Sequence, residues 1–192
     1  MSLYSSNGES SDSEEEDIFE LPAIADPFVW TRGNIEEFKH EIETSNTGML
    51  KVCNGEILTV RIPTADDGRY IYWEFATDDY DLAFGVSFEW NKCPDPEVTL
   101  DVNDSESEDD DDFWDDDEYL TDVNDIEAPK KEQRTEDHPT SVVLPTYRRN
   151  SHQEVIMGSH KYPGRGVYLL KFDNSYSLFR TKIVYYRAYY GK

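Results

Sequence analysis

Basic and tyrosine side chains are interleaved over the last quarter of the chain. Residues 145–192 hold nine Lys and Arg and eight Tyr, against two acidic residues, Glu154 and Asp173. Cations beside aromatic rings suit an anionic membrane surface or an acidic protein partner. The alternative is that these bases lie on the outer faces of ordinary strands and balance the chain's own acidic segments. The candidate binding residues are Arg148, Arg149, Lys161, Arg165, Arg180 and Lys182.

Acidic residues are concentrated in two other segments. Residues 1–26 hold eight and residues 101–127 hold fifteen, and neither segment contains a Lys or Arg. They account for nearly all of the net charge of −24, so the rest of the 192 residues is close to neutral. An acidic chain lacks the basic footprint that nucleic-acid binding requires. The aromatic and β-branched content of the rest argues against a fully disordered protein.

These charge runs also predict the domain organisation. Like charges at this density repel one another and oppose compact folding. We therefore expect a disordered tail and lead-in over 1–27 and a domain over 28–192, interrupted by a disordered acidic insert over 103–139. A long surface insert costs little in loop-closure entropy. Folding of the insert onto the basic residues, which would be autoinhibitory, is a hypothesis that the charges suggest.

Four serines in the acidic segments have an acidic residue three positions further on. This spacing fits the substrate preference of an acidophilic kinase, and phosphorylation would deepen the local negative charge. Plain solvating serines are the alternative. The candidate phosphorylation sites are Ser11, Ser13, Ser105 and Ser107.

Signatures of catalysis and of metal binding are weak. The chain has no nucleophile elbow, phosphate-binding loop or kinase motif. His152 and His160 have no partner at zinc-site spacing, so we expect surface or packing roles. Cys53 and Cys93 lack a CxxC context and are expected to be free thiols. Asp78–Asp81 lacks the Gly and distal Glu of a calcium loop and suits a turn. We expect a non-enzyme with no cofactor and no metal.

One helix and a series of strands must position these residues. Asn34 and Glu37 suggest a capping box, and Ile35, Phe38 and Ile42 share one helical face, so a helix is expected from there to the region of residues 44–48. Pro22 and Pro27 make the preceding segment an extended lead-in. Period-two alternation predicts strands over 57–62, 69–75, 82–90, 98–102, 141–144, 154–158, 167–172 and 181–190.

Short strands at this spacing with a single helix predict an all-β protein, an antiparallel sandwich with jelly-roll-like connectivity. No apolar run reaches the length of a transmembrane helix, and the N-terminus has no apolar signal-peptide region. The expected compartment is the cytosol.

Several ordered stretches resemble the GOLD (Golgi dynamics) domain family. The resemblance covers about residues 28–192, includes an acidic insert at the same place, and extends to the lead-in Trp30-Thr31-Arg32. Within that family, the chain is similar to the C-terminal GOLD domain of a Golgi-resident acyl-CoA-binding adaptor and its GOLD-only relatives. The stretches are Trp73-Glu74-Phe75-Ala76-Thr77-Asp78-Asp79-Tyr80-Asp81, Phe84-Gly85-Val86, Phe88-Glu89-Trp90, Gly158-Ser159-His160, residues 162–177 and Tyr185-Tyr186-Arg187.

The resemblance implies a non-catalytic interaction module in Golgi organisation and secretory traffic. It implies Golgi-associated protein partners and a cytoplasmic location, peripheral on the Golgi membrane. A sandwich edge can bind an added strand, which is one physical route to such partners. The sequence shows neither the acyl-CoA-binding domain nor the transmembrane helix of other GOLD proteins, so their activities are not expected. The alternative is a carbohydrate- or lipid-binding jelly roll, in which Tyr and Trp faces stack on a ligand.

Overall fold

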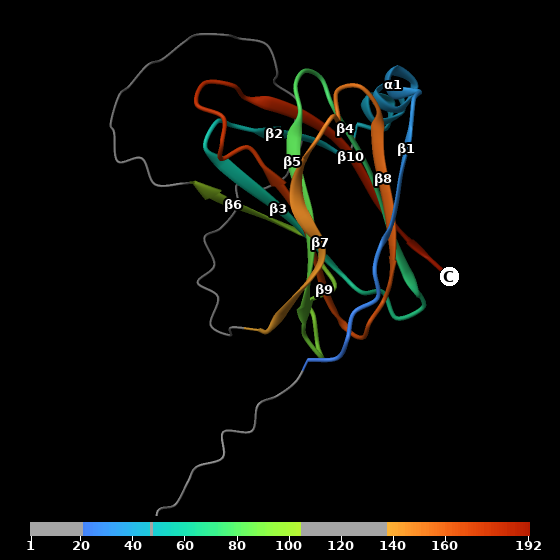
Figure 1. Ribbon diagram of the computed structural model, residues 1–192. Coiled ribbons are helices and arrows are strands. Elements are labelled where there is room, and N and C mark those ends of the chain that lie inside the picture. Colours follow the sequence, from blue (N-terminus) through green and yellow to red (C-terminus); the bar gives the residue numbers. More distant parts are fainter. Residues whose placement is uncertain (1–20, 47, 105–137) are drawn as a thin grey trace, which may run out of the picture.

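Ten strands and one helix make up the part of the chain that the structure, a computed structural model, describes: residues 21–46, 48–104 and 138–192 (Figure 1). The single helix is α1 (Ile35–Ser45). The strands are β1 (Phe28–Arg32), β2 (Met49–Val52), β3 (Glu56–Pro63), β4 (Tyr70–Thr77), β5 (Leu82–Trp90), β6 (Thr99–Asp104), β7 (Thr140–Arg149), β8 (Val155–Lys161), β9 (Gly166–Asp173) and β10 (Lys182–Gly191).

The strands form two five-stranded antiparallel sheets that pack face to face. The first sheet has the order β1-β8-β4-β10-β2 and the second has the order β6-β3-β9-β5-β7. Successive strands mostly alternate between the sheets, from β3 to β4 to β5 and again from β7 through β10. This alternation makes a jelly-roll-like sandwich, and it confirms the all-β fold class expected from the sequence.

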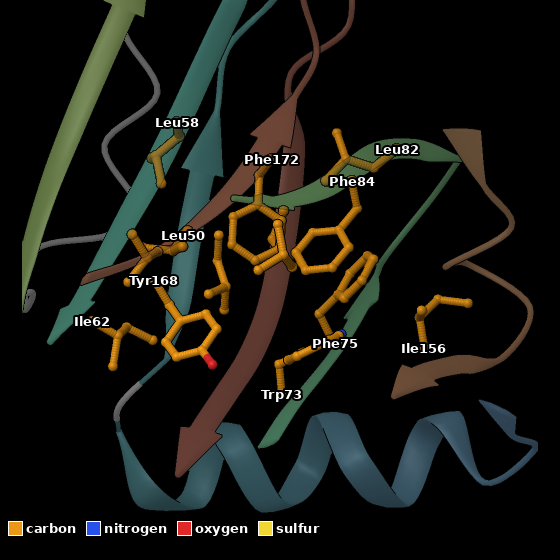
Figure 2. Packing of buried hydrophobic residues seen from close by; sticks show 14 of the residues in the cluster. Leu50, Leu58, Ile62, Trp73, Phe75, Leu82, Phe84, Ile156, Tyr168 and Phe172 are labelled. Carbon is orange, nitrogen blue, oxygen red and sulfur yellow. The ribbon is translucent and has the colours of Figure 1, made fainter. Parts of the chain in front are cut away.

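Aromatic side chains fill the space between the two sheets (Figure 2). They come from alternate positions of β4, β5 and β9, because successive side chains of a strand point to opposite faces. Phe75 and Phe172 meet edge to face, with ring centroids 5.4 Å apart and an interplanar angle of 80°. Phe84 lies 4.4 Å from Phe75 and 5.2 Å from Phe172. These three rings and Trp73 are almost fully buried, so the strands are joined by one continuous core.

A glycine allows the largest of these side chains to fit. Trp73 in β4 lies opposite Gly158 in the neighbouring strand β8. A Cβ atom added at Gly158 would overlap the indole ring. The ring therefore occupies the volume that any other residue at position 158 would need.

Helix α1 packs on the outer face of the first sheet. Phe38 and Ile42, which the sequence assigns to the inner face of the helix, are both buried. They contact Val155 of β8 and Tyr185 of β10 in a second, smaller apolar cluster that also includes Ala76 and Met157. The amphipathic pattern thus places the helix correctly, and the sheet covers its apolar face.

Four local features differ from the sequence-based expectation. Strand β2, which pairs with β10, is not among the expected strands. Residues 28–32 are paired with β8 as strand β1 and are more than an extended lead-in. Strand β7 runs past Pro145 to Arg149, which an edge strand with irregular register tolerates. The expected capping box is wrong in detail, because Asn34 Nδ2 donates to Glu37 Oε2 at 3.0 Å and the side chain caps no backbone N–H.

The ends of the expected insert belong to the fold. Asn103 and Asp104 extend β6, and the Trp90 amide donates to the Pro139 carbonyl at 2.9 Å. The remainder of the expected insert, and most of the expected tail, lie outside the described residues. The candidate phosphorylation sites Ser11, Ser13, Ser105 and Ser107 lie there too and stay predictions.

We expect Gly158→Ala to destabilise the protein by about 1–3 kcal/mol, because the added methyl group must displace the Trp73 indole or the backbone. Urea unfolding followed by tryptophan fluorescence measures this change. Gly33→Ala is the matched control, since a Cβ at Gly33 has nothing within 4 Å. Equal stability of the two variants would contradict the packing described for Trp73.

Candidate functional site

The six candidate basic residues lie at two opposite ends of the sandwich. Lys161 is paired with Tyr70 at the start of β4. Asp81, which contacts Arg148 and Lys182, follows the end of the same strand. An eight-residue strand spans about 25 Å. The sequence predicted these six residues as one patch. The fold divides them into a group of four (Arg148, Arg149, Arg180 and Lys182) and a group of two (Lys161 and Arg165).

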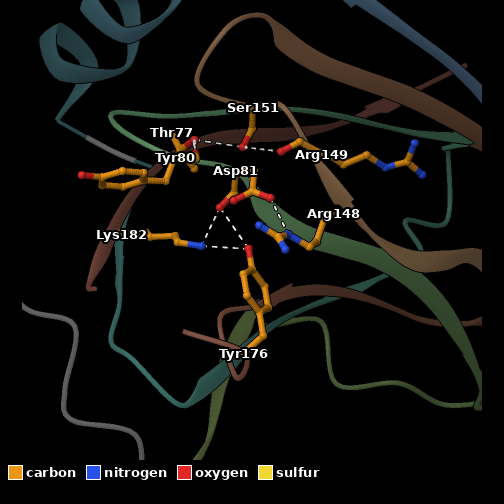
Figure 3. Close-up of polar contacts among 8 residues, drawn as sticks. All are labelled: Thr77, Tyr80, Asp81, Arg148, Arg149, Ser151, Tyr176 and Lys182. Atoms are coloured by element: carbon orange, nitrogen blue, oxygen red, sulfur yellow. Dashed lines mark hydrogen bonds and ion pairs between the residues drawn. The ribbon is translucent and has the colours of Figure 1, made fainter. Parts of the chain in front are cut away.

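Asp81 binds two members of the group of four, Arg148 and Lys182 (Figure 3). Its carboxylate accepts a hydrogen bond from Arg148 Nε at 2.5 Å. Its main-chain carbonyl accepts hydrogen bonds from Lys182 Nζ at 2.5 Å and from Tyr176 Oη at 3.0 Å. The bonded Arg148 guanidinium is the main reason that the pKa of Asp81 lies below its usual range. One turn residue thus connects β7, β10 and the loop between β9 and β10.

Lys182 is the most enclosed cation of the group. The residue is buried, with 4% of its surface exposed, and burial lowers the pKa of its ammonium group. Its Nζ also donates to Tyr176 Oη at 2.8 Å, and it lies 4.4 Å from the centroid of the same ring. Arg148 stacks on this ring as well, at 4.6 Å. Lys182 therefore has a structural role, and its charge is poorly placed for a partner.

Asn174 and Ser151 join the surrounding turns. Asn174 Nδ2 lies within hydrogen-bond distance of the main-chain oxygens of Val52, Cys53 and Arg180, at 2.7–3.2 Å. Ser151 Oγ lies 2.9 Å from Thr77 Oγ1. We call the end of the sandwich formed by residues 78–81, 150–154 and 174–181 the loop end. The sequence analysis did not identify the Asn174 side chain as a link between two other turns.

The loop end carries the most exposed apolar side chains among the described residues. Phe179 and Leu178 expose 89% and 75% of their surfaces. Arg180 follows directly, and its guanidinium lies 3.9 Å from the centroid of the Tyr80 ring. The signal that could have revealed this site is the Leu-Phe-Arg sequence itself, since a polar turn rarely needs two adjacent large apolar residues.

The other three candidates are the group of two and Arg149 of the group of four. Arg165 is exposed and forms an ion pair with Asp66. Lys161 is exposed at the end of β8. Arg149 lies 5.9 Å from the centroid of the Tyr147 ring beside it.

His160 has the packing role expected for it. Its Nε2 lies 2.9 Å from the Ala25 carbonyl, and because a carbonyl only accepts, Nε2 must carry the hydrogen. Its Nδ1 lies 2.7 Å from the Tyr168 hydroxyl and accepts from it when the ring is neutral. Burial lowers the pKa of His160. This histidine fixes the lead-in segment against the sandwich.

Chemical sites of other kinds are not found in the part of the chain that the structure describes. Within residues 21–46, 48–104 and 138–192, no three His, Cys, Asp or Glu side chains gather as metal ligands. Cys53 and Cys93 are both free thiols, as the sequence predicts. No helix among these residues is long and apolar enough to cross a membrane.

The chain was compared with protein families and with known proteins. Residues 52–191 match GOLD_2, described as Golgi-dynamics membrane-trafficking. The chain is 49% identical to the Golgi resident protein GCP60 of Homo sapiens over 173 residues, and 42% identical to protein TMED8 of Mus musculus over 171 residues. A shorter match of 57 residues, 49% identical, is to the FYVE and coiled-coil domain-containing protein 1 of Mus musculus.

These matches differ in how much of each protein they cover. They take up 90%, 88% and 28% of this chain, in the same order. They take up 31%, 52% and 4% of the relatives. The chain thus spans about a third of GCP60 and about half of TMED8.

We expect the free energy of unfolding to fall as the pH decreases below about 6.5, because the unfolded His160 then binds a proton that the buried ring resists. The loss stops once the pH is below the pKa of the folded state. Thermal denaturation at about pH 7.5 and about pH 5.5 measures it, and His160→Gln should show a smaller difference between the two. An equal difference in wild type and variant would contradict this role.

Proposed function

The chain belongs to the GOLD family of Golgi-dynamics membrane-trafficking domains, and we propose that it is a non-catalytic adaptor that associates peripherally with Golgi membranes. The proposal places the loop end against the membrane. The single observation that supports it best is the loop tip, where Leu178 and Phe179 are exposed beside Arg180.

The physical chemistry of this tip suits an anionic lipid surface. Fully burying a Leu or Phe side chain contributes about 1.5–3 kcal/mol. Each Lys or Arg near an anionic membrane adds about 1 kcal/mol. Arg148 and Arg180 flank the tip, and their aromatic neighbours Tyr176 and Tyr80 suit the membrane interface. Two apolar side chains and two cations give the reversible binding that a peripheral protein needs.

Partner proteins would bind away from the membrane in this proposal. The sandwich has four edge strands, β1 and β2 in the first sheet and β6 and β7 in the second. An edge strand can pair with an extended peptide through its main chain. Pro145 and the register irregularity in β7 hinder such pairing, which favours the other edges.

A ligand-binding jelly roll is supported less well. Such a protein needs a concave pocket lined by aromatic side chains. Here the aromatic side chains of β4, β5 and β9 pack on one another between the sheets. We therefore favour the loop end over an interior pocket as the binding site.

The double variant Leu178→Ser, Phe179→Ser should weaken binding to vesicles of phosphatidylcholine and phosphatidylserine by at least about tenfold, because losing about 1.4 kcal/mol of apolar burial suffices for that. Vesicle sedimentation measures the change. Both side chains are more than 70% exposed, so the fold should be unaffected. Val142→Ser in β7 is the matched control, since Val142 is 65% exposed elsewhere on the surface.

Two charge-reversal variants, one at each end of the sandwich, test which end binds the membrane. Arg180→Glu should weaken vesicle binding and Arg165→Glu should leave it unchanged. Arg148→Glu is less informative, because it also breaks the ion pair with Asp81. Unchanged binding of both the double variant and Arg180→Glu would contradict the membrane role of the loop end.

A further inference from the structure

An aromatic row crosses the outer face of the first sheet. The pairing of β1, β8, β4 and β10 places Phe28, Ser159, Tyr72 and Tyr189 side by side at one level. Tyr70 lies at the next level, between Lys161 and Gly191. We call Phe28, Tyr70, Tyr72 and Tyr189 the aromatic face.

The rings of the aromatic face form a platform with small residues between them. Tyr72 and Tyr189 stack with centroids 5.2 Å apart and planes 5° from parallel. A Cβ atom at Gly191 would overlap the Tyr72 ring, so this glycine lets the ring lie across the neighbouring strand. Ser159, a small residue, lies between Phe28 and Tyr72 in this cross-strand row. Exposed rings on either side of a small residue suit contact with the side chains of an extended peptide.

Helix α1 leaves this face uncovered. Its contacts begin one level further along the sheet, at Met157 and Arg187, and continue to Val155, Ala76 and Tyr185. Figure 1 shows the helix at one end of the first sheet. Phe28 and Tyr189 expose 70% and 42% of their surfaces. The solvent face of an antiparallel sheet is normally polar, so an exposed aromatic row indicates contact with another molecule.

The charges around the aromatic face favour an acidic occupant. The two carboxylates between this face and the helix are already paired. Glu74 accepts from Arg187 Nε at 2.9 Å, and Glu41 lies 3.3 Å from Arg187 Nη1. Lys161 is exposed at the border and has no carboxylate partner among the described residues. Lys161 is therefore the unpaired cation that a partner's carboxylate could meet at this border, while the exposed carboxylate of Asp26 lies two residues before Phe28.

The position of the face also separates it from the membrane contact proposed above. Tyr70 and Tyr72 are at the start of β4, and the loop end follows the end of that strand, roughly 20 Å away. A domain bound through its loop end would leave the aromatic face open to a soluble partner.

We propose that the aromatic face binds an acidic peptide segment with large apolar side chains, supplied by a partner protein. The proposal rests on the adaptor function and identifies the chemistry of one partner. Apolar side chains of the peptide would pack on Phe28 and on the Tyr72–Tyr189 pair, and its carboxylates would lie near Lys161.

The chain's own sequence supplies a suitable probe. Residues 109–120 read Asp-Asp-Asp-Asp-Phe-Trp-Asp-Asp-Asp-Glu-Tyr-Leu, which is acidic and carries large apolar residues. A fluorescein-labelled peptide of this sequence would be titrated with the full chain and followed by fluorescence anisotropy. The same titration would use the full-chain variant Phe113→Ala, Trp114→Ala, so that the chain's own copy of the sequence does not compete.

We expect saturable binding by the Phe113→Ala, Trp114→Ala chain. Adding Phe28→Ser and Tyr189→Ser should weaken it by at least about tenfold, while adding Val142→Ser should not. Weaker binding by the wild-type chain would mean that its own acidic segment competes for the face, which agrees with the chemistry proposed. Vesicle binding should be unchanged by Phe28→Ser and Tyr189→Ser, so the membrane proposal can fail or succeed independently.

Three results would overturn the proposal. They are no saturable binding by either chain, equal binding by the Phe28→Ser, Tyr189→Ser variant, and equal binding of a peptide whose Phe, Trp and Tyr are replaced by Ala. The last result would mean that charge alone attracts the peptide. Phe28→Ser alone, at a 70% exposed position, repeats the test with the smallest risk to folding.

Discussion

The aromatic packing between the two sheets is the constraint on which the rest of the structure depends. Phe75, Phe84 and Phe172 fill the interior, and Trp73 fits only because its neighbour in β8 is Gly158. A ligand would have to displace these side chains to enter the interior. The contacts that we propose therefore lie on the outside, at a loop and on a sheet face.

The two proposed contact surfaces lie on the outside of the sandwich and are built in different ways. At the loop end, Asp81 holds Arg148 and Lys182 in place, and the Leu178–Phe179 tip stands beyond them in solvent. On the first sheet, cross-strand register alone assembles the aromatic face from three strands, β1, β4 and β10. The two surfaces lie at opposite ends of β4, so a membrane and a partner protein could be bound together, which is what an adaptor must do.

The sequence predicted the features that depend on local patterns. Alternation in residues 82–90 and the apolar face of Phe38 and Ile42 predicted the main strands and the helix, and the ordered motifs predicted the GOLD family, which is confirmed. Sequence patterns did not predict contacts between residues that are distant in the chain. Nothing local reveals that Arg148 meets Asp81, that Lys161 lies far from Arg180, or that Phe28 shares a level with Tyr189, because these relations depend on strand register.

The most direct test of the account is the location of the fluorescently tagged full chain in living cells beside a Golgi marker. We predict that the two signals coincide, and that the overlap depends on the membrane, since it should disappear when the Golgi is chemically dispersed. A uniform signal through the cell with an intact Golgi would contradict the central claim that this GOLD domain acts as a Golgi adaptor.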